Sequence, residues 1–448
     1  MIWAAKLELW LSFYCFFIYN RRVFTFEWRE TMNYKLRKKL LIMTGMFLLL
    51  LCIGLISAKN GQAKTYTISP KTKPCDNTVH AAAYNKKTKN YWTIRSYLRK
   101  IEKQKGGTLI LKKGTYNITN TLYVSSNTHI ILKDGAVLKK TKTTGTKKMT
   151  AASSMFQFIR DSRSKKKGVY GKYNGEKNIS LVGEGTATID LCGLKMGNKD
   201  VIGIIMGHNQ NVTIENVTFK NMRYGHLIEL DASKKVSIKN CTFTGHKASG
   251  KNNKEAINLD TPDKKRTGFK SVWSKMDGTS NSGISITGCT FSNLEVGVGT
   301  HRYTGNSYHT NVVINNCTFQ KDQTAIRVLN WKNAAITQNT FTDITPNARY
   351  PYAFFMAGVK GINFSYNTFR NCGTHGGTRN SKQLLQFWCG AGYSANQTIY
   401  KPTTSSITKA QADLFKTNTT ENCGIIRTYN CPYNIDSTDD KNFDNSNL

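Results

Sequence analysis

The sequence predicts an all-β fold, a single-stranded right-handed parallel β-helix in which one chain winds as a solenoid. Two observations lead to this prediction. A nine-residue pattern ending in Val/Cys-Thr-Phe occurs at residues 211–219, 235–243, 283–291 and 311–319, and looser copies end at Phe341 and Phe369. Each copy alternates apolar and polar residues, as a strand with one buried face does. The phenylalanines are separated by 24, 48, 28, 22 and 28 residues, so we expect them to stack inside the solenoid.

The N-terminal residues carry the pattern of an export signal. Residues 32–63 begin with a basic stretch, continue with an apolar run over residues 40–58 and end in small residues near Ala63. This is the order of a secretory signal peptide. The apolar run is also long enough to span a bilayer, so an uncleaved anchor is the alternative. We expect a secreted protein without stable membrane insertion. Met32 is the expected start, because residues 1–31 precede a complete signal.

The chain is strongly basic. Removing residues 1–63 removes nine Lys or Arg and three Asp or Glu, which lowers the formal charge from +37 to +31. Such a field attracts polyanions, so the expected partner is an acidic polysaccharide or an anionic cell surface. Nucleic acid is not expected, because no nucleic-acid-binding motif accompanies the export signal. A generally basic surface is the alternative, since the lysines are scattered.

Nine of the eleven cysteines follow residue 63. Cys241, Cys289 and Cys317 occur at one position of the repeat, which indicates small side chains stacked in the core. Cys423 and Cys431 are the better candidates for a disulfide, which an exported protein can form. No zinc-ligand spacing is present, and no cofactor is expected.

The elements before the repeat fit the start of a solenoid. Residues 64–105 form an N-terminal segment in which Thr93 is a suitable N-cap for a helix over residues 94–103. This helix has apolar side chains on one face. Residues 106–116 and 128–138 then have the pattern of strands.

The solenoid is expected over residues 106–390. From residue 391 the repeat is lost and the chain turns to Thr, Asn and Ser, so residues 391–448 are expected to form a C-terminal cap or tail. Residues 425–429 have the pattern of one last strand.

A second strand precedes each phenylalanine by about fourteen residues, and aligning these strands predicts two columns. The first is Ile205, Glu229, Asn258, Gly299, Arg327 and Phe355, and the second is Gly207, Asp231, Asp260, His301, Leu329 and Ala357. Residues i and i+2 of a strand share a face, and the apolar residues between them must point inward. The polar members, Glu229, Asp231, Asn258, Asp260, His301 and Arg327, should therefore share the outward face. An ion-paired ladder without catalytic function is the alternative interpretation.

Overlong connections are expected to form the wall of a cleft beside this face. The excess of the coil before Phe291 falls in residues 261–282. A long loop beside a polar face is typical of a cleft wall, and aromatic rings there suit the apolar faces of sugars. The candidate substrate-binding residues are therefore Asn258 and four aromatic residues of these connections, Trp273, Tyr303, Tyr308 and Trp331.

The order of the polar residues resembles that of the polygalacturonase family of glycoside hydrolases. The strands of that family bear Asn-Thr-Asp, Asp-Asp, Gly-His-Gly and Arg-Ile-Lys motifs. The matching residues here are Asp231 in Glu-Leu-Asp, Asp260 in Asn-Leu-Asp, His301 in Gly-Thr-His-Arg and Arg327 in Ile-Arg-Val. The helix and the strands after it also resemble the opening of pectin-lyase-fold proteins, in which a helix covers the first coil. This resemblance covers roughly residues 90–390.

The motifs depart from the family pattern at three positions. One aspartate stands in place of the pair, Arg302 follows the histidine, and Leu329 replaces the lysine. Part of the family's water-activating carboxylates and one anchor for a substrate carboxylate are therefore missing.

The resemblance implies hydrolysis of glycosidic bonds in an acidic extracellular polysaccharide. An inverting hydrolase needs a protonated carboxyl and a carboxylate about 6.5–9.5 Å apart, and crowding raises a carboxyl pKa so that one group stays protonated. Asp260 is the expected acid, Asp231 and Glu229 are the candidate bases, and His301 is expected to tune or relay protons.

Two arginines and a further glutamate complete the expected site. Arg327 and Arg302 are expected to hold a substrate carboxylate. Glu255, three residues before Asn258, is expected at the margin of the cleft.

Two other functions fit the same residues. A polysaccharide lyase would use Arg327 or a lysine as base, and Ca²⁺ bound by Glu229, Asp231 and Asp260. The other alternative is a surface protein that binds a polysaccharide or a cell wall without catalysis, because a fold by itself does not decide function.

Overall fold

The computed structural model describes residues 64–77, 79–247, 254–263, 269, 271–301, 307–347, 350–374, 382–389, 405–435 and 443–446. Residues Lys64–Leu448 form one compact unit. The expected signal peptide at 32–63 and the segment 1–31 lie outside the described residues. Within the described ranges, no helix is both long and apolar enough to cross a membrane.

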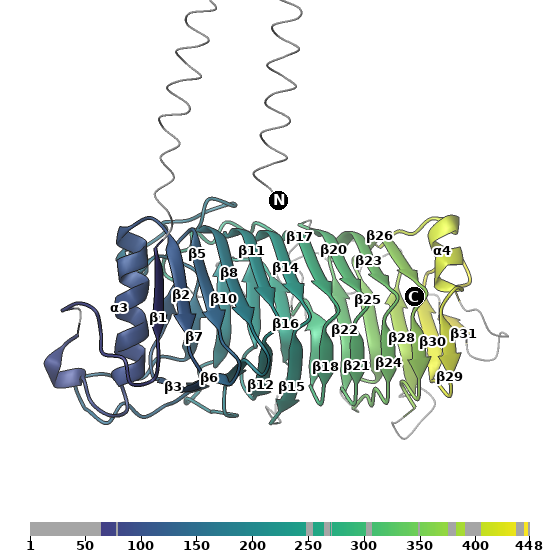
Figure 1. The fold of residues 1–448 in the computed structure, drawn as a ribbon. Helices are drawn as coiled ribbons and strands as arrows, with labels where there is room; N and C mark the ends of the chain where they lie inside the picture. The colour runs from purple at the N-terminus through teal and green to yellow at the C-terminus, as the bar shows by residue number, and fades with distance from the viewer. Residues whose placement is uncertain are drawn as a thin grey trace, which may run out of the picture. The chain divides into compact units, whose positions relative to one another are not determined.

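Three parallel sheets run along the unit, and successive strands of the chain pass from one sheet to the next (Figure 1). Sheet A contains β1 (Thr65–Ile68), β2 (Gly107–Leu111), β5 (Thr128–Leu132), β8 (Lys177–Gly183), β11 (Gln210–Glu215), β14 (Lys234–Lys239), β17 (Ser282–Thr287), β20 (His309–Asn315), β23 (Trp331–Thr337) and β26 (Lys360–Ser365). Sheet B contains β3 (Gly114–Ile118), β6 (Ala136–Lys140), β9 (Thr188–Asp190), β12 (Thr218–Met222), β15 (Thr242–His246), β18 (Thr290–Ser292), β21 (Thr318–Gln320), β24 (Thr340–Thr342), β27 (Thr368–Arg370) and β29 (Thr419–Glu421). Sheet C contains β4 (Leu122–Tyr123), β7 (Ser154–Gln157), β10 (Ile202–Gly207), β13 (Ile228–Asp231), β16 (Glu255–Asp260), β19 (Val296–Gly299), β22 (Thr324–Leu329), β25 (Tyr352–Ala357), β28 (Gln383–Trp388), β30 (Ile425–Tyr429) and β31 (Phe443–Ser446). The predicted all-β parallel solenoid is confirmed.

The repeat phenylalanines stack inside the solenoid as predicted. From Phe219 to Phe369, neighbouring ring centroids lie 4.5–5.2 Å apart and the planes differ by 6–20°. All six rings are buried. The stack removes large apolar rings from water on every coil, so the core lengthens with each repeat.

A column of cysteines continues as a column of asparagines at the bend between sheets A and B. Cys289 and Cys317 are buried, as predicted, and the backbone N–H of Cys289 donates to Cys317 Sγ at 3.4 Å. On the next coils the N–H of Cys317 donates to Asn339 Oδ1 at 2.9 Å, and the N–H of Asn339 donates to Asn367 Oδ1 at 3.0 Å. These side chains satisfy backbone groups that the bend takes out of the strand ladders.

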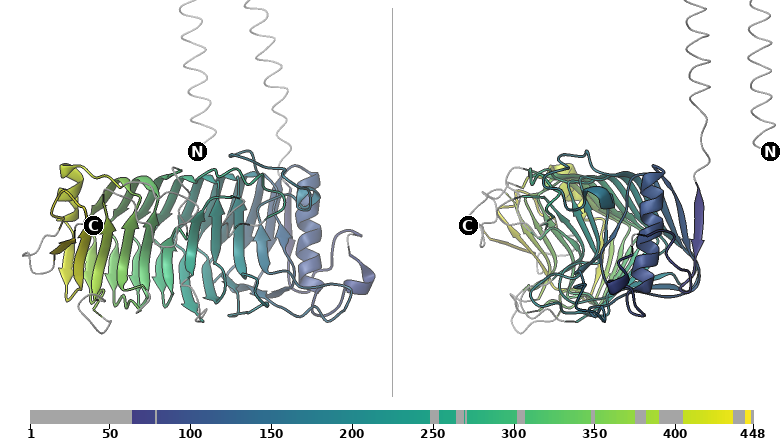
Figure 2. Two further views of the ribbon diagram at one scale, coloured as in Figure 1. Left: turned by 180° about the vertical axis from the view of Figure 1, so that it is seen from behind. Right: turned by 90° about the vertical axis from the view of Figure 1, so that its left-hand side faces the viewer.

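Helices cover both ends of the solenoid (Figures 1 and 2). α3 (Lys89–Lys103) lies across the first coil. It begins five residues before the predicted start, after Thr88, and Thr93 lies inside it, where its hydroxyl donates to the Thr72 carbonyl at 3.0 Å. α4 (Lys409–Phe415) packs on β26 at the other end. Two 3₁₀ turns span Ala81–Ala83 and Asp161–Arg163.

The coils extend beyond the predicted limits of 106–390. β1 pairs with β2 at the start, and β29, β30 and β31 continue sheets B and C in the C-terminal segment. The predicted strand over 425–429 is β30.

The expected disulfide between Cys423 and Cys431 is not formed, and every cysteine of the described ranges is free. The Cys423 thiol lies against Cys372, and the Cys431 thiol lies against Cys389. The solenoid brings together residues one coil apart, and Cys423 and Cys431 belong to the same coil.

Candidate active site

The register across sheet C reproduces the predicted columns Ile205–Glu229–Asn258–Gly299–Arg327–Phe355 and Gly207–Asp231–Asp260. His301 lies just after β19, and its backbone N–H donates to Asn258 Oδ1 at 3.2 Å. The structure therefore brings all six predicted polar residues together. They lie between two apolar clusters, one with Ile205 of β10 and Trp273 of the connection after β16, and one with Leu329 and Phe355 of β22 and β25.

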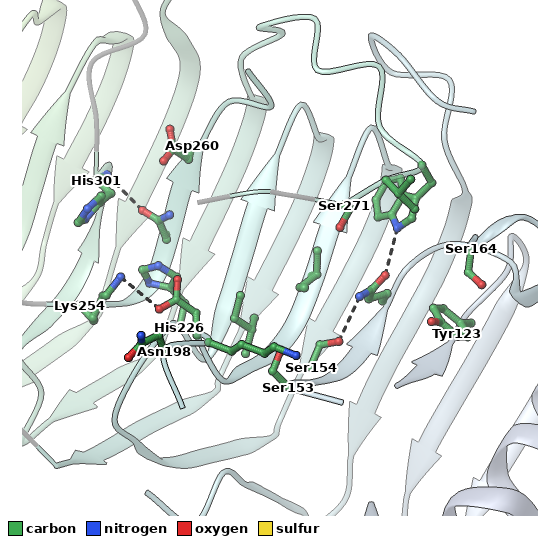
Figure 3. Close-up of a pocket in the computed structure, with 18 residues that line it drawn as sticks. Tyr123, Ser153, Ser154, Ser164, Asn198, His226, Lys254, Asp260, Ser271 and His301 are labelled. Atoms are coloured by element: carbon green, nitrogen blue, oxygen red, sulfur yellow. Dashed lines mark hydrogen bonds and ion pairs between the residues drawn. The ribbon is translucent and has the colours of Figure 1, made fainter. Parts of the chain in front are cut away.

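A cavity of about 620 Å³ opens on this part of sheet C (Figure 3). Asp260 and His301 lie at one end, and Tyr123 and Ser164 lie at the other. The remaining lining residues are Ser153, Ser154, Gln157, Asn198, Lys199, Asp200, Ile202, Ile205, His226, Lys254, Asn258, Ser271, Val272 and Trp273. Hydroxyls and amides predominate, with two lysines and two aspartates, which suits a hydroxylated ligand.

Glu229 and Asp231 are 1% and 0% exposed and do not line the cavity. Burial, with help from the Asp260 carboxyl, raises the pKa of Glu229 from 4.5 to about 8. Burial, followed by the Glu229 and Asp260 carboxyls, raises the pKa of Asp231 well above its ordinary value. Both shifts favour the protonated form of the carboxyl at neutral pH. This neutral pair lies beside Asp260 of the adjacent strand.

His226 lies beside Glu229 and offers an acceptor to its protonated carboxyl. Burial holds the pKa of His226 well below 6.5, so the ring is neutral. Its Nδ1 lies 2.7 Å from the Glu255 carbonyl oxygen, which assigns the ring proton to Nδ1. Nε2 is then an acceptor, 3.4 Å from Glu229 Oε2. Asn258 Nδ2 donates to both Glu229 oxygens at 3.1 Å, so the Glu229 proton can point at His226.

Glu255 lies at the centre of a second group of charges rather than at the margin. It is fully buried, and its carboxylate forms an ion pair with Arg327. Its Oε2 lies 3.4 Å from His301 Nδ1. The Arg327 guanidinium also lies over the Tyr350 ring, 5.5 Å from its centroid.

Arg327 is therefore not available as the expected anchor for a substrate carboxylate. It is only 6% exposed and neutralises Glu255, because a buried carboxylate needs a charge partner. Arg302, the second expected anchor, lies outside the described residues. Among the described residues that line the cavity, the lysines are Lys199 and Lys254, and Lys254 Nζ lies 3.6 Å from Asp200 Oδ1.

Two glycines make room for these side chains. A Cβ on Gly299 would lie 3.3 Å from Glu255 Cγ and 3.1 Å from Arg327 Cβ. A Cβ on Gly207 would lie 2.4 Å from Phe269 Cζ. The absence of a side chain at Gly299 leaves space for the buried ion pair. The absence of a side chain at Gly207 allows Phe269 of the connection after β16 to pack against the sheet.

The predicted aromatic residues have different surroundings. Trp273 lines the cavity, but it is 1% exposed and its Nε1 donates to Gln157 Oε1 at 3.0 Å, so it offers little surface to a sugar. Trp331 is wholly buried in the core, with Nε1 donating to Thr300, and cannot contact a substrate. Tyr308 is half-buried beside Lys360, away from the cavity lining. Tyr303 lies outside the described residues.

Sequence reasoning missed His226 and Lys254. Both lie in the bends just before β13 and β16, where no alternation of polar and apolar residues marks a face. Each precedes a member of the first column by three or four residues, and that spacing is the signal that could have found them.

In the part of the chain that the structure describes, no three His, Cys, Asp or Glu residues are arranged to hold a metal ion. The arrangement is suited to proton transfer by Asp260 and His301 at the cavity.

Comparison with known proteins supports the fold. No family model matches the chain. Over 153 residues, 31% of this chain, it is 29% identical to "plasmin and fibronectin-binding protein A" of Streptococcus pneumoniae. The chain spans about a fifth of the length of that protein.

Two solved structures of PfbA, described as a surface adhesin of Streptococcus pneumoniae, have similar folds. One has a TM-score of 0.59 and 19% identity, with 86% of this chain and 92% of that chain covered. The other has a TM-score of 0.54 and 17% identity, with 81% and 84% covered. At this level of identity the likeness establishes architecture, and the chain has the fold of the right-handed parallel β-helix proteins.

Proposed function

We propose that this chain is an extracellular carbohydrate-active protein that hydrolyses glycosidic bonds of an acidic polysaccharide. The observation that carries the proposal is Asp260 at the end of the cavity, beside the protonated Asp231 and Glu229 of the neighbouring strand. A glycosidase needs a carboxyl that can protonate the leaving oxygen and a base that can activate water.

Asp260 and His301 line the cavity and have these roles in the proposal; because Asp260 is only 1% exposed, the substrate has to approach its carboxyl through the cavity. Asp260 protonates the leaving oxygen, and Asp231, its partner in the strand register, can replace the proton. His301 takes a proton from the attacking water, while the hydroxide oxygen bonds to the anomeric carbon. Glu255 Oε2 and the Arg327 guanidinium each lie 3.4 Å from His301 Nδ1, so this ion pair holds the imidazole in place.

An acidic substrate is compatible with this cluster of carboxyls. Glu229 and Asp231 hold protons, and Glu255 is paired with Arg327, so the cluster is less negative than its composition suggests. Lys199 and Lys254 line the wall, and Lys254 is paired with Asp200 at 3.6 Å.

The test is incubation of the purified protein with a panel of acidic and neutral polysaccharides, with and without a chelator. Reducing ends and the ultraviolet absorbance of unsaturated products are followed together. We expect new reducing ends without absorbance, and loss of at least about a hundredfold in rate in Asp260→Asn, the range for removal of a general acid. Asp413→Asn, an exposed aspartate on α4, is the matched control. Unsaturated products would identify a lyase instead.

The similarity to PfbA favours a second candidate, a surface protein that binds its partner without cleaving it. That similarity covers most of this chain in structure. Binding to a polysaccharide or host protein, with no product and no effect of Asp260→Asn, would favour this candidate over the hydrolase.

A further inference from the structure

A second cavity, of about 600 Å³, adjoins the first at the N-terminal end of the solenoid. Tyr123 lines both cavities, so the two are contiguous across one side chain. Ser164 lines the first and its neighbour Lys165 lines the second. In Figure 3, Tyr123 and Ser164 lie at the end of the first cavity that is remote from Asp260.

The second cavity is lined by cations beside the buried Trp92 ring. α3 supplies Trp92 and Arg95, and the Arg95 guanidinium lies 5.3 Å from the Trp92 ring centroid. Arg95 is held by Asp161 through bonds of 2.8 and 3.2 Å, which neutralises that carboxylate. Lys148 and Lys165, both exposed, therefore leave the cavity positively charged.

We propose that this second cavity is a distal binding site for the same acidic polysaccharide. The bound chain then lies along the outer face of sheet C, from α3 to Asp260. The inference rests on the proposed function only in taking a polysaccharide as the ligand of the first cavity. It assigns α3 a role in binding in addition to covering the first coil.

The distance between the two cavities requires a ligand longer than a disaccharide. Asp260 on β16 and Tyr123 on β4 are separated by four steps of the sheet, and at about 4.8 Å per step this distance is about 19 Å. A disaccharide is too short to reach from Asp260 into the second cavity. A longer chain contacts both cavities, so its affinity should rise with length.

The experiment measures binding of oligogalacturonides, from disaccharide to decasaccharide, to the non-cleaving Asp260→Asn variant by titration calorimetry. We expect Kd to fall with length until both cavities are filled. In that background, Lys148→Ala/Lys165→Ala should weaken decasaccharide binding by roughly three- to tenfold, because each exposed ion pair contributes about 0.2–1 kcal/mol. The gain in affinity between short and long chains should largely disappear.

The matched control is Lys332→Ala/Lys416→Ala, which removes the same charge from exposed positions on β23 and after α4. It should leave the length dependence unchanged. The proposal is overturned if the control loses as much affinity as the test variant, or if affinity does not rise with length. It is also overturned if neutral cello-oligosaccharides of equal length bind as tightly. A length-dependent affinity in a wild-type protein that cleaves nothing would keep the distal site and reject the hydrolase.

Discussion

At the scale of single residues, burial decides the charge of the candidate site. Four carboxyl groups, Glu229, Asp231, Glu255 and Asp260, lie within two neighbouring strands, and all are nearly inaccessible to water. Such a group is tolerated only if each member is protonated or paired. The raised pKa values favour protonated Glu229 and Asp231, and Glu255 is paired with Arg327, so three of the four acids add little negative charge.

Glu229→Gln should change how stability depends on pH. The folded protein keeps a proton on Glu229 up to about pH 8, whereas the unfolded chain releases it near 4.5. The wild-type protein therefore loses stability as pH rises through this window. The variant should be similar to wild type at pH 4 and more stable by up to a few kcal/mol at pH 8.

Urea unfolding from pH 4 to 8 measures this difference. Glu184→Gln, which changes a carboxylate that is 46% exposed, is the control and should follow wild type. An identical pH dependence in wild type and Glu229→Gln would contradict the assignment of the proton.

Arg327→Met should destabilise the protein by about 3–5 kcal/mol, because it leaves the buried Glu255 carboxylate without its cation. Arg327→Met/Glu255→Gln removes both charges and should recover much of that loss. Chemical denaturation of the single and double variants measures their free energies of unfolding. The comparison gives the interaction free energy between Arg327 and Glu255. If Arg327 instead serves mainly to bind substrate, the single variant would bind less tightly with unchanged stability.

At the scale of elements, the bends decide which side chains meet. Asn339 and Asn367 occupy the position that Cys317 occupies in the preceding coil. A thiol is a weak hydrogen-bonding group, whereas an amide can donate and accept at once. The asparagine part of the column therefore ties adjacent coils more strongly than the cysteine part.

Asn367→Ala should cost more stability than Cys289→Ala at the equivalent position. Asn367 Nδ2 donates to the Ile336 carbonyl at 2.9 Å, and its Oδ1 accepts the Asn339 N–H. Removing the amide leaves both buried groups unsatisfied, at about 1–3 kcal/mol each. Cys289→Ala removes mainly a weak thiol contact and should cost about 1 kcal/mol. Equal losses in denaturant unfolding would show that packing rather than hydrogen bonding determines the cost.

At the scale of the whole molecule, positive charge and a long polar face occur together. Residues 64–448 carry a formal charge of +31, and the lysines of both cavities belong to this excess. A field of this sign concentrates anionic polymers at the protein surface.

Binding of an acidic polysaccharide should therefore weaken strongly with salt. The Debye length falls from about 10 Å at 0.1 M to about 3 Å at 1 M ionic strength, so affinity should fall about tenfold or more over this range. Calorimetry at several salt concentrations measures the change, with a neutral polysaccharide as the control. An affinity for the acidic polymer that does not depend on salt would mean that apolar contacts dominate binding.

Much of the architecture and the outline of the site follow from local sequence patterns. The recurring Phe219-type position and the alternation around it specify a parallel solenoid, since only stacked coils bury a face that repeats at every turn. The same repeat aligns Glu229 with Asn258 and Asp231 with Asp260, because a strand register transfers a spacing in sequence directly into neighbourhood in space.

Tertiary structure alone decided which groups are free to act. Arginine and tryptophan are residue types expected on a substrate-binding surface. In the folded protein, however, Arg327 is paired with Glu255 and Trp331 is buried in the core. His226 and Lys254 lie in bends without periodicity, and their spacing before Glu229 and Asn258 does not by itself place their side chains at the cavity. Burial and charge pairing depend on contacts between coils, and these contacts have no signature in the local order of residues.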